Sequence, residues 1–94
     1  AALKQEVYNT LVEYNNRQQN LQASYASAQQ LQKANEVYLI TLQKEERLGT
    51  KSIIELLEAK QDLYEAQLEV INIFYDKIYN KFELDALVGN FDVD

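Results

Sequence analysis

The apolar residues of this chain recur at intervals of three and four positions along most of its length, which is the period of an amphipathic α-helix. In the first half they predict one long helix, from about residue 3 to residue 48, at about 1.5 Å per residue. The apolar stripe of this first helix consists of Leu3, Val7, Leu11, Tyr14, Leu21, Tyr25, Ala28, Leu31, Ala34, Tyr38 and Leu42.

A polar run interrupts this stripe, because residues 15–20 read Asn-Asn-Arg-Gln-Gln-Asn. A stripe this thin buries little apolar surface, so we expect the helix to pack through close approach of the small residues that follow the run. These are Ala23, Ser24, Ala26, Ser27 and Ala28. The alternative is that the helix frays or kinks at the polar run.

The second half is richer in apolar residues and contains two columns at seven-residue spacing. The first column has Leu56, Leu63 and Val70, widened by Ala59, Ala66 and Ile73. The second has Leu57, Tyr64, Ile71 and Ile78, widened by Ile53, Phe74 and Phe82. A seven-residue repeat is typical of left-handed coiled coils. Two columns exceed what one seam requires, so we expect this helix to contact neighbours on both sides, as a stave does in a barrel.

A short turn separates the two segments. Gly49, one of only two glycines, is expected to end the first helix, because glycine adopts the left-handed conformation without steric cost. Ser52 is followed three residues later by Glu55, the capping-box pattern that begins a helix. We therefore predict a tip turn at residues 48–52, a second helix from residue 52 to about 88, closed by Gly89, and a short tail at 89–94. The fold class is all-α: one antiparallel two-helix coiled-coil hairpin spanning residues 1–94.

The composition supports this fold and excludes several classes of partner. The 94 residues include no proline, which uninterrupted helices require, and carry a formal net charge of -6. That charge argues against a nucleic acid or an anionic membrane surface as partner. No apolar run approaches the roughly 18 residues of a transmembrane helix, so we expect no membrane span in this chain. It opens in a helical pattern without a signal peptide, so in an exported parent it would be an internal or processed piece.

Two helices bury little surface for the chain entropy that they lose on folding. We therefore expect the hairpin to oligomerise or to dock onto a larger body.

The sequence contains no histidine and no cysteine, which removes most arrangements used for hydrolysis, redox chemistry or zinc binding. We expect no enzyme activity, no catalytic residue, no cofactor and no metal site. Glu55 and Glu58 share one helical face beside the turn, where a divalent cation is conceivable. The simpler interpretation is a solvated pair that the helix macrodipole stabilises. The seven tyrosines fall mostly on or beside the apolar stripes, which favours core or interface roles.

Three stretches, taken in order, resemble a known family. They are Gly49-Thr50-Lys51-Ser52-Ile53-Ile54-Glu55-Leu56-Leu57-Glu58-Ala59, then Leu63-Tyr64-Glu65-Ala66-Gln67, and finally Leu84-Asp85-Ala86-Leu87-Val88-Gly89. They are similar to the C-terminal region of the TolC-like outer membrane efflux proteins. The match covers residues 47–89, while the preceding helix matches in character only.

The resemblance implies a hairpin from the periplasmic α-helical barrel of a trimeric outer membrane exit duct for drug efflux or type I secretion. The tip of Arg47, Leu48, Gly49, Thr50, Lys51 and Ser52 would dock the hairpin of a periplasmic adaptor protein. Glu55 and Glu58 would take the places of the acids that ring the narrowed entrance. An inner-membrane pump or ABC transporter would supply the energy. The parent would lie in the outer membrane, with this segment in the periplasm.

Periodicity alone supports an alternative, which is a generic antiparallel coiled-coil module with a structural or oligomerisation role.

Overall fold

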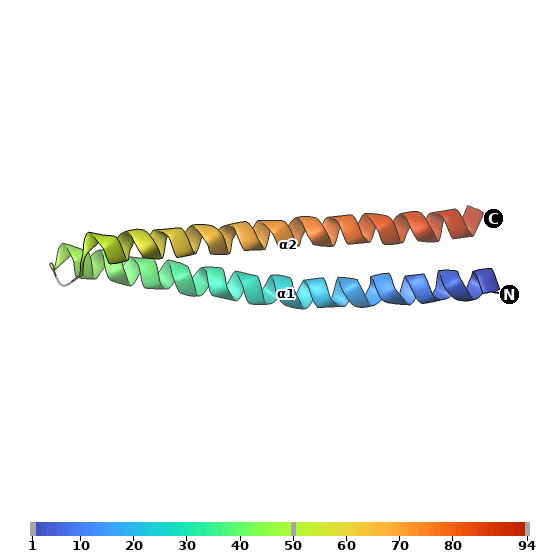
Figure 1. Ribbon diagram of the computed structural model, residues 1–94, viewed down its shortest axis with the longest axis horizontal. Helices are drawn as coiled ribbons and strands as arrows, with labels where there is room; N and C mark the ends of the chain where they lie inside the picture. The colour runs from blue at the N-terminus through green and yellow to red at the C-terminus, as the bar shows by residue number, and fades with distance from the viewer. Residues whose placement is uncertain (1, 50, 94) are drawn as a thin grey trace.

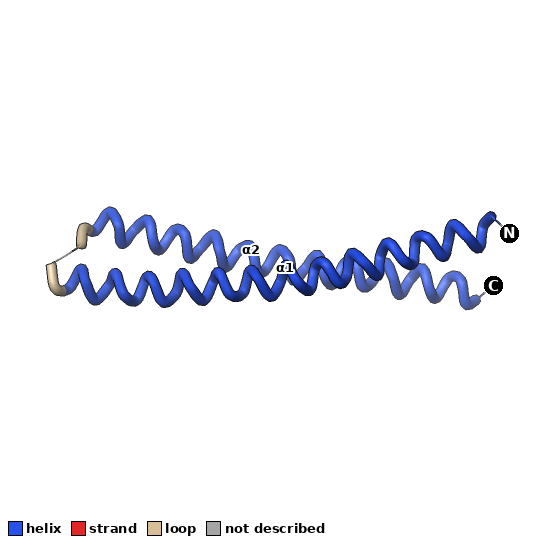
Figure 2. Tube along the Cα trace, turned by 90° about the horizontal axis from the view of Figure 1, so that it is seen from below, coloured by secondary structure: helices blue, strands red, loops and turns tan. Residues whose placement is uncertain are grey.

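The protein is a rod formed by two long helices that lie side by side and are joined at one end (Figure 1). The computed structural model describes residues 2–49 and 51–93. Helix α1 spans Ala2–Arg47 and helix α2 spans Ile53–Val93, and the described residues include no strand. The rod measures 71 × 15 × 15 Å, and a second view at right angles shows the same pairing along its length (Figure 2). The predicted all-α hairpin is confirmed.

The seam between the helices follows a seven-residue repeat. In α2 every buried or half-buried residue lies on one line with alternating steps of three and four positions. This line consists of Leu56, Ala59, Leu63, Ala66, Val70, Ile73, Lys77, Asn80, Leu84 and Leu87. It contains the whole first column predicted from the sequence. Because α2 keeps this repeat over its length, the same face stays turned toward α1.

Helix α1 keeps the same repeat, although its apolar residues do not. The predicted stripe matches the seam from Val7 to Ala28, but the seam then continues through Gln32, Asn35, Leu39 and Leu42. The predicted members Leu31 and Tyr38 are 56% and 53% exposed. A seam that moved to residue 31 would rotate by about 100° away from α2, because each residue turns the helix by that angle. Polar Gln32 and Asn35 are therefore brought into the seam.

The structure also tests the two expectations for the middle of α1, which are a possible break at the polar run and packing through small residues. The helix runs unbroken through residues 15–20, so the polar run causes neither fraying nor a kink there. Of the five small residues expected at the interface, only Ala28 is buried, while Ala23, Ser24, Ala26 and Ser27 are exposed. Close approach instead depends on Ala28 in α1 and on the buried alanines of α2.

The two glycines behave differently. Gly49 has φ +76°, and its N–H donates to the Glu46 carbonyl at 2.9 Å, which is one of the two hydrogen bonds that define a Schellman helix end. The predicted stop at Gly49 is thus confirmed. The predicted stop at Gly89 is wrong, because α2 continues to Val93 and Gly89 has no positive φ. An interior glycine costs a helix only about 1 kcal/mol, and the seam extends as far as Leu87, so the helix tolerates it.

Candidate functional site

The tip is where the chain reverses, and it exposes apolar side chains. Leu48 is 79% exposed, and Ile53 and Ile54, at the start of α2, are also exposed. Arg47 ends α1 and Lys51 follows the turn, so basic groups flank this apolar surface. Thr50, the remaining predicted tip residue, lies outside the described residues. The arrangement is a small apolar knob with a basic edge.

The start of α2 is fixed by Ser52. Its hydroxyl accepts a hydrogen bond from the Glu55 backbone N–H at 3.2 Å, so the predicted cap is confirmed on the serine side. The Glu55 carboxylate, however, lies 3.7 Å from Lys51 Nζ. The side chain of Glu55 thus forms an ion pair with the lysine four residues before it, and this pair partly neutralises one of the two predicted entrance acids.

Glu58 is the other predicted entrance acid, and it is exposed one turn further along α2. Its side chain and that of Glu55 lie beside the tip. Among the residues that the structure describes, no group of three acidic side chains is placed to hold a metal ion. Over the same residues, neither helix contains a stretch that is long and apolar enough to cross a membrane.

The second apolar column of α2 remains uncovered. Its four members and Phe82 lie on one line with Ile54, Leu68 and Tyr75, and we call this line the outer stripe. The predicted flanking residues Ile53 and Phe74 are exposed but lie beside this line. The spacing of the outer stripe again alternates between three and four residues, with Gln61 completing the repeat. The outer stripe consists of Ile54, Leu57, Tyr64, Leu68, Ile71, Tyr75, Ile78 and Phe82. Their exposure ranges from 37% at Ile78 to 70% at Phe82. Each member lies two residues before a position of the seam, so the stripe lies about 160° around the helix from it.

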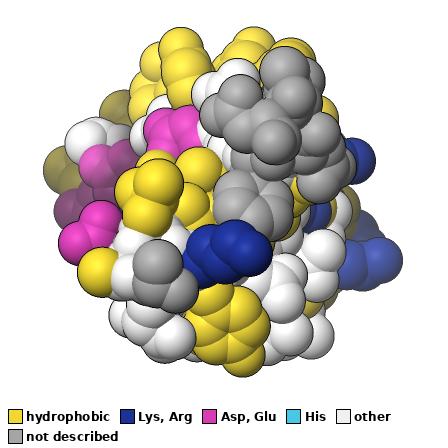
Figure 3. Space-filling model, turned by 90° about the vertical axis from the view of Figure 1, so that its right-hand side faces the viewer, with side chains coloured by type: hydrophobic (Ala, Val, Ile, Leu, Met, Phe, Trp, Pro, Cys, Tyr) yellow, Lys and Arg dark blue, Asp and Glu magenta, His cyan; other side chains and the backbone are white. Residues whose placement is uncertain are grey.

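The outer stripe therefore gives α2 two apolar faces on nearly opposite sides. An end-on view of the rod likewise shows hydrophobic side chains at the surface on several sides (Figure 3). Many of the tyrosines lie outside the seam: Tyr64 and Tyr75 belong to the outer stripe, while Tyr14 and Tyr25 are half-buried. The predicted core role holds for these last two, and the predicted interface role of the exposed tyrosines stays a prediction.

A polar layer crosses the seam in the half of the rod that is remote from the tip. Asn80 is 3% exposed, and its Nδ2 donates to the Tyr14 carbonyl at 3.0 Å and to Gln18 Oε1 at 2.9 Å. Its Oδ1 is buried without a hydrogen-bond partner. Hydrogen bonding to Glu83, followed by the negative charge of Glu83, raises the pKa of Tyr14 above the usual tyrosine value.

Sequence reasoning missed this layer. A signal was available, because Asn80 continues the seven-residue column of Ala59, Ala66 and Ile73 and is the polar exception in it.

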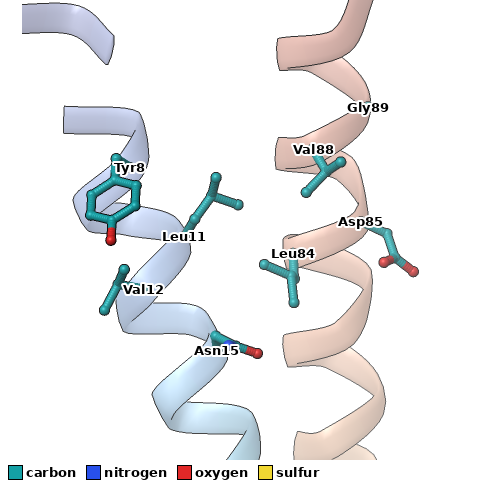
Figure 4. A pocket seen from close by; sticks show the side chains of 8 residues that line it. All are labelled: Tyr8, Leu11, Val12, Asn15, Leu84, Asp85, Val88 and Gly89. Carbon is teal, nitrogen blue, oxygen red and sulfur yellow. The ribbon is translucent and has the colours of Figure 1, made fainter. Parts of the chain in front are cut away.

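A crevice of about 540 Å³ lies between the helices near the open end of the rod (Figure 4). Leu11 of α1 and Leu84 and Val88 of α2 project into the space between the helices, whereas Asp85 points away from α1. The crevice offers apolar contact, and its polar groups do not converge on one point.

Comparison with protein-family models, with curated proteins and with solved structures finds no match to this chain.

Proposed function

We propose that this chain is a tip-bearing hairpin of the periplasmic α-helical barrel of a TolC-like, trimeric outer membrane exit duct for drug efflux or type I secretion. The duct function rests on the resemblance of the motifs in residues 47–89. The observation that carries the proposal is the outer stripe. A barrel stave needs one apolar face for each neighbour, and α2 has a buried seam and a second apolar face about 160° from it.

The tip would dock the hairpin of a periplasmic adaptor. Support comes from the exposed Leu48, Ile53 and Ile54, whose apolar surface is small enough for a coiled-coil end to cover. Lys51 and Arg47 add positive charge at the rim. The left-handed Gly49 holds these groups in place, because the chain reverses there without strain.

Glu55 and Glu58 would contribute to the acidic ring at the entrance. Repeated around a symmetric constriction, their carboxylates would favour cations and disfavour anions. The Lys51–Glu55 ion pair reduces the negative potential at Glu55, which makes Glu58 the stronger contributor to the acidic ring in this conformation. Such a duct performs no catalysis, and an inner-membrane pump or ABC transporter would drive transport.

The test is sedimentation velocity of the hairpin alone and mixed with the hairpin of a periplasmic adaptor. Gly49→Val removes the left-handed residue of the tip, and Gly89→Val is the matched control inside α2. Loss of the complex in Gly49→Val but not in Gly89→Val is the expected result. Self-association without adaptor binding by the unmodified hairpin would contradict docking at the tip and would support the generic coiled-coil module.

A further inference from the structure

A column of acidic side chains runs along α2 at intervals of seven residues. It consists of Glu55, Asp62, Glu69, Asp76 and Glu83, and all five residues are exposed. Seven residues make nearly two helical turns, so the carboxylates lie on one face, about 10.5 Å apart. Each acid directly precedes a residue of the seam. The column therefore forms one edge of the groove between the helices.

Four of these acids line three successive crevices between α1 and α2, which we call the acidic groove. Asp62 and Glu69 line a crevice of about 290 Å³, and Glu69 also lines the next one, of about 420 Å³. Asp76 and Glu83 line a third, of about 250 Å³. The first two crevices also share Leu31 of α1, so they are adjacent.

On the opposite wall of the acidic groove, which α1 forms, many of the side chains are small and uncharged. Ala23, Ser24 and Ser27 of α1 line its middle crevice and are exposed. Small side chains allow the backbone of another helix to approach closely. The groove thus has the shape that a third helix requires.

Helix α1 does not neutralise this column. Arg17 is the only basic residue that lines the three crevices, and its guanidinium pairs with Glu13 of its own helix at 3.5 Å. Among the described residues, no Lys or Arg nitrogen lies within 4 Å of the carboxylates of Asp62, Glu69, Asp76 and Glu83. α2 carries nine acidic and three basic residues, whereas α1 carries five of each. The negative potential of the groove is therefore unmatched within the chain.

Asn80 provides an independent sign of a missing donor. It lines the same crevice as Asp76 and Glu83, is almost fully buried, and has an Oδ1 without a hydrogen-bond partner. A buried carbonyl oxygen normally has a donor. A lysine ammonium or arginine guanidinium that entered this crevice would bring several donors to the two carboxylates, and it would reach the buried Asn80 oxygen once the side chains over that oxygen moved aside.

We propose that the acidic groove binds an α-helix of another protein that carries Lys or Arg at seven-residue intervals. The spacing of the carboxylates is too wide for shared metal ligation, in agreement with the absence of a metal-holding acidic group among the described residues. A second copy of this chain fits poorly, because each of its helices places at most two basic residues on one seven-residue column, at 33 and 47 in α1 and at 60 and 81 in α2, against four carboxylates. The site lies along residues 62–83, away from the tip at 47–52.

The probe is a fluorescein-labelled helical peptide built from Ala and Gln, with one lysine in each of four heptads. Its control is an isomer of the same composition with the four lysines at irregular spacing. Fluorescence anisotropy should give an affinity at least tenfold higher for the heptad peptide, and that affinity should fall as salt is added. Equal binding of the two peptides would overturn the proposal.

Two variants with the same net charge locate the site. The groove variant combines Asp62→Asn, Glu69→Gln, Asp76→Asn and Glu83→Gln. The control variant combines Glu6→Gln, Glu36→Gln, Glu46→Gln and Asp85→Asn, none of which lines the acidic groove. The groove variant should bind the heptad peptide at least tenfold more weakly, and the control should stay within twofold of the unmodified chain. An equal loss in both variants would mean that only net charge matters, which contradicts the proposal.

A third measurement leaves the groove unmodified. The side-chain amide resonance of Asn80 should shift as unlabelled heptad peptide is added, and an unmoved Asn80 resonance with shifts elsewhere would refute this placement. Gly49→Val should bind the peptide normally, since the groove does not include the tip. Loss of peptide binding in Gly49→Val would contradict the separation of the two sites.

Discussion

The same substitution at the two glycines should change stability in opposite directions. Gly49 has φ +76°, a conformation that costs an alanine about 1–2 kcal/mol. Gly89 has no positive φ and lies within α2, where alanine is favoured over glycine by about 1 kcal/mol. An added Cβ meets nothing within 4 Å at either position. Steric clashes with neighbouring side chains therefore do not contribute at either glycine, and the difference between the two substitutions reflects backbone conformation alone.

We expect Gly49→Ala to lower the free energy of unfolding by about 1–2 kcal/mol and Gly89→Ala to raise it by up to about 1 kcal/mol. The gain at Gly89 falls below the full value if the end of α2 frays. For a chain of this size, about 1 kcal/mol corresponds to a shift of the melting temperature by about 4–8 °C.

The assay is urea and thermal denaturation followed by circular dichroism, with all proteins at one concentration because association also contributes to stability. Gly49→Asn serves as a control, since asparagine tolerates the left-handed region better than alanine does and should recover part of the loss. Shifts of the same sign at both glycines would refute the reasoning, because they would mean that backbone conformation does not decide the effect.

Three further predictions concern the polar layer and the cap. Asn80→Leu should change the free energy of unfolding in urea by no more than about 1 kcal/mol, because removing a buried oxygen without a donor and adding apolar contact offset the loss of the hydrogen bonds to the Tyr14 carbonyl and Gln18; a loss above about 3 kcal/mol would contradict this. Ser52→Ala should lower the melting temperature, because the loss of the hydrogen bond from the Glu55 N–H lowers the free energy of unfolding by about 1 kcal/mol. Ser52→Asp should keep the melting temperature near that of the unmodified chain, because aspartate also accepts this hydrogen bond. Glu83→Gln should lower the raised pKa of Tyr14, as measured by NMR titration. In the unmodified chain, the stability that comes from this interaction is complete below pH 10.0 and is lost as the pH rises through the higher folded-state pKa of Tyr14.

The helices, the turn and the α2 side of the seam could be predicted from the sequence because each has a local cause. Gly49 and Ser52 carry their own backbone preferences, and Leu56 and Leu63 begin a column that keeps its seven-residue spacing. Such signals act within a few residues and do not depend on a partner. The geometry expected at the tip is for this reason the part of the candidate site that agrees best with the structure.

The seam of α1 beyond Ala28 could not be predicted in this way. Leu31 and Tyr38 continue an apolar pattern, whereas Gln32 and Asn35 do not, yet the second pair faces α2. What decides between them is the repeat that α2 imposes along the whole rod, which is invisible in one helix taken alone. The role of Asn80 depends likewise on groups 62 and 66 positions away in the chain.

The unbroken seven-residue seam also restricts how the length of the rod can change. Removing seven residues from α1 and seven from the facing part of α2 leaves every remaining seam residue facing the other helix and shortens the 71 Å rod by about 10.5 Å. Removing any smaller number turns one helix out of phase with the other and exposes seam residues. The distance between the tip and the open end is therefore adjustable only in discrete steps, and relatives of different reach should differ by whole heptads in both helices.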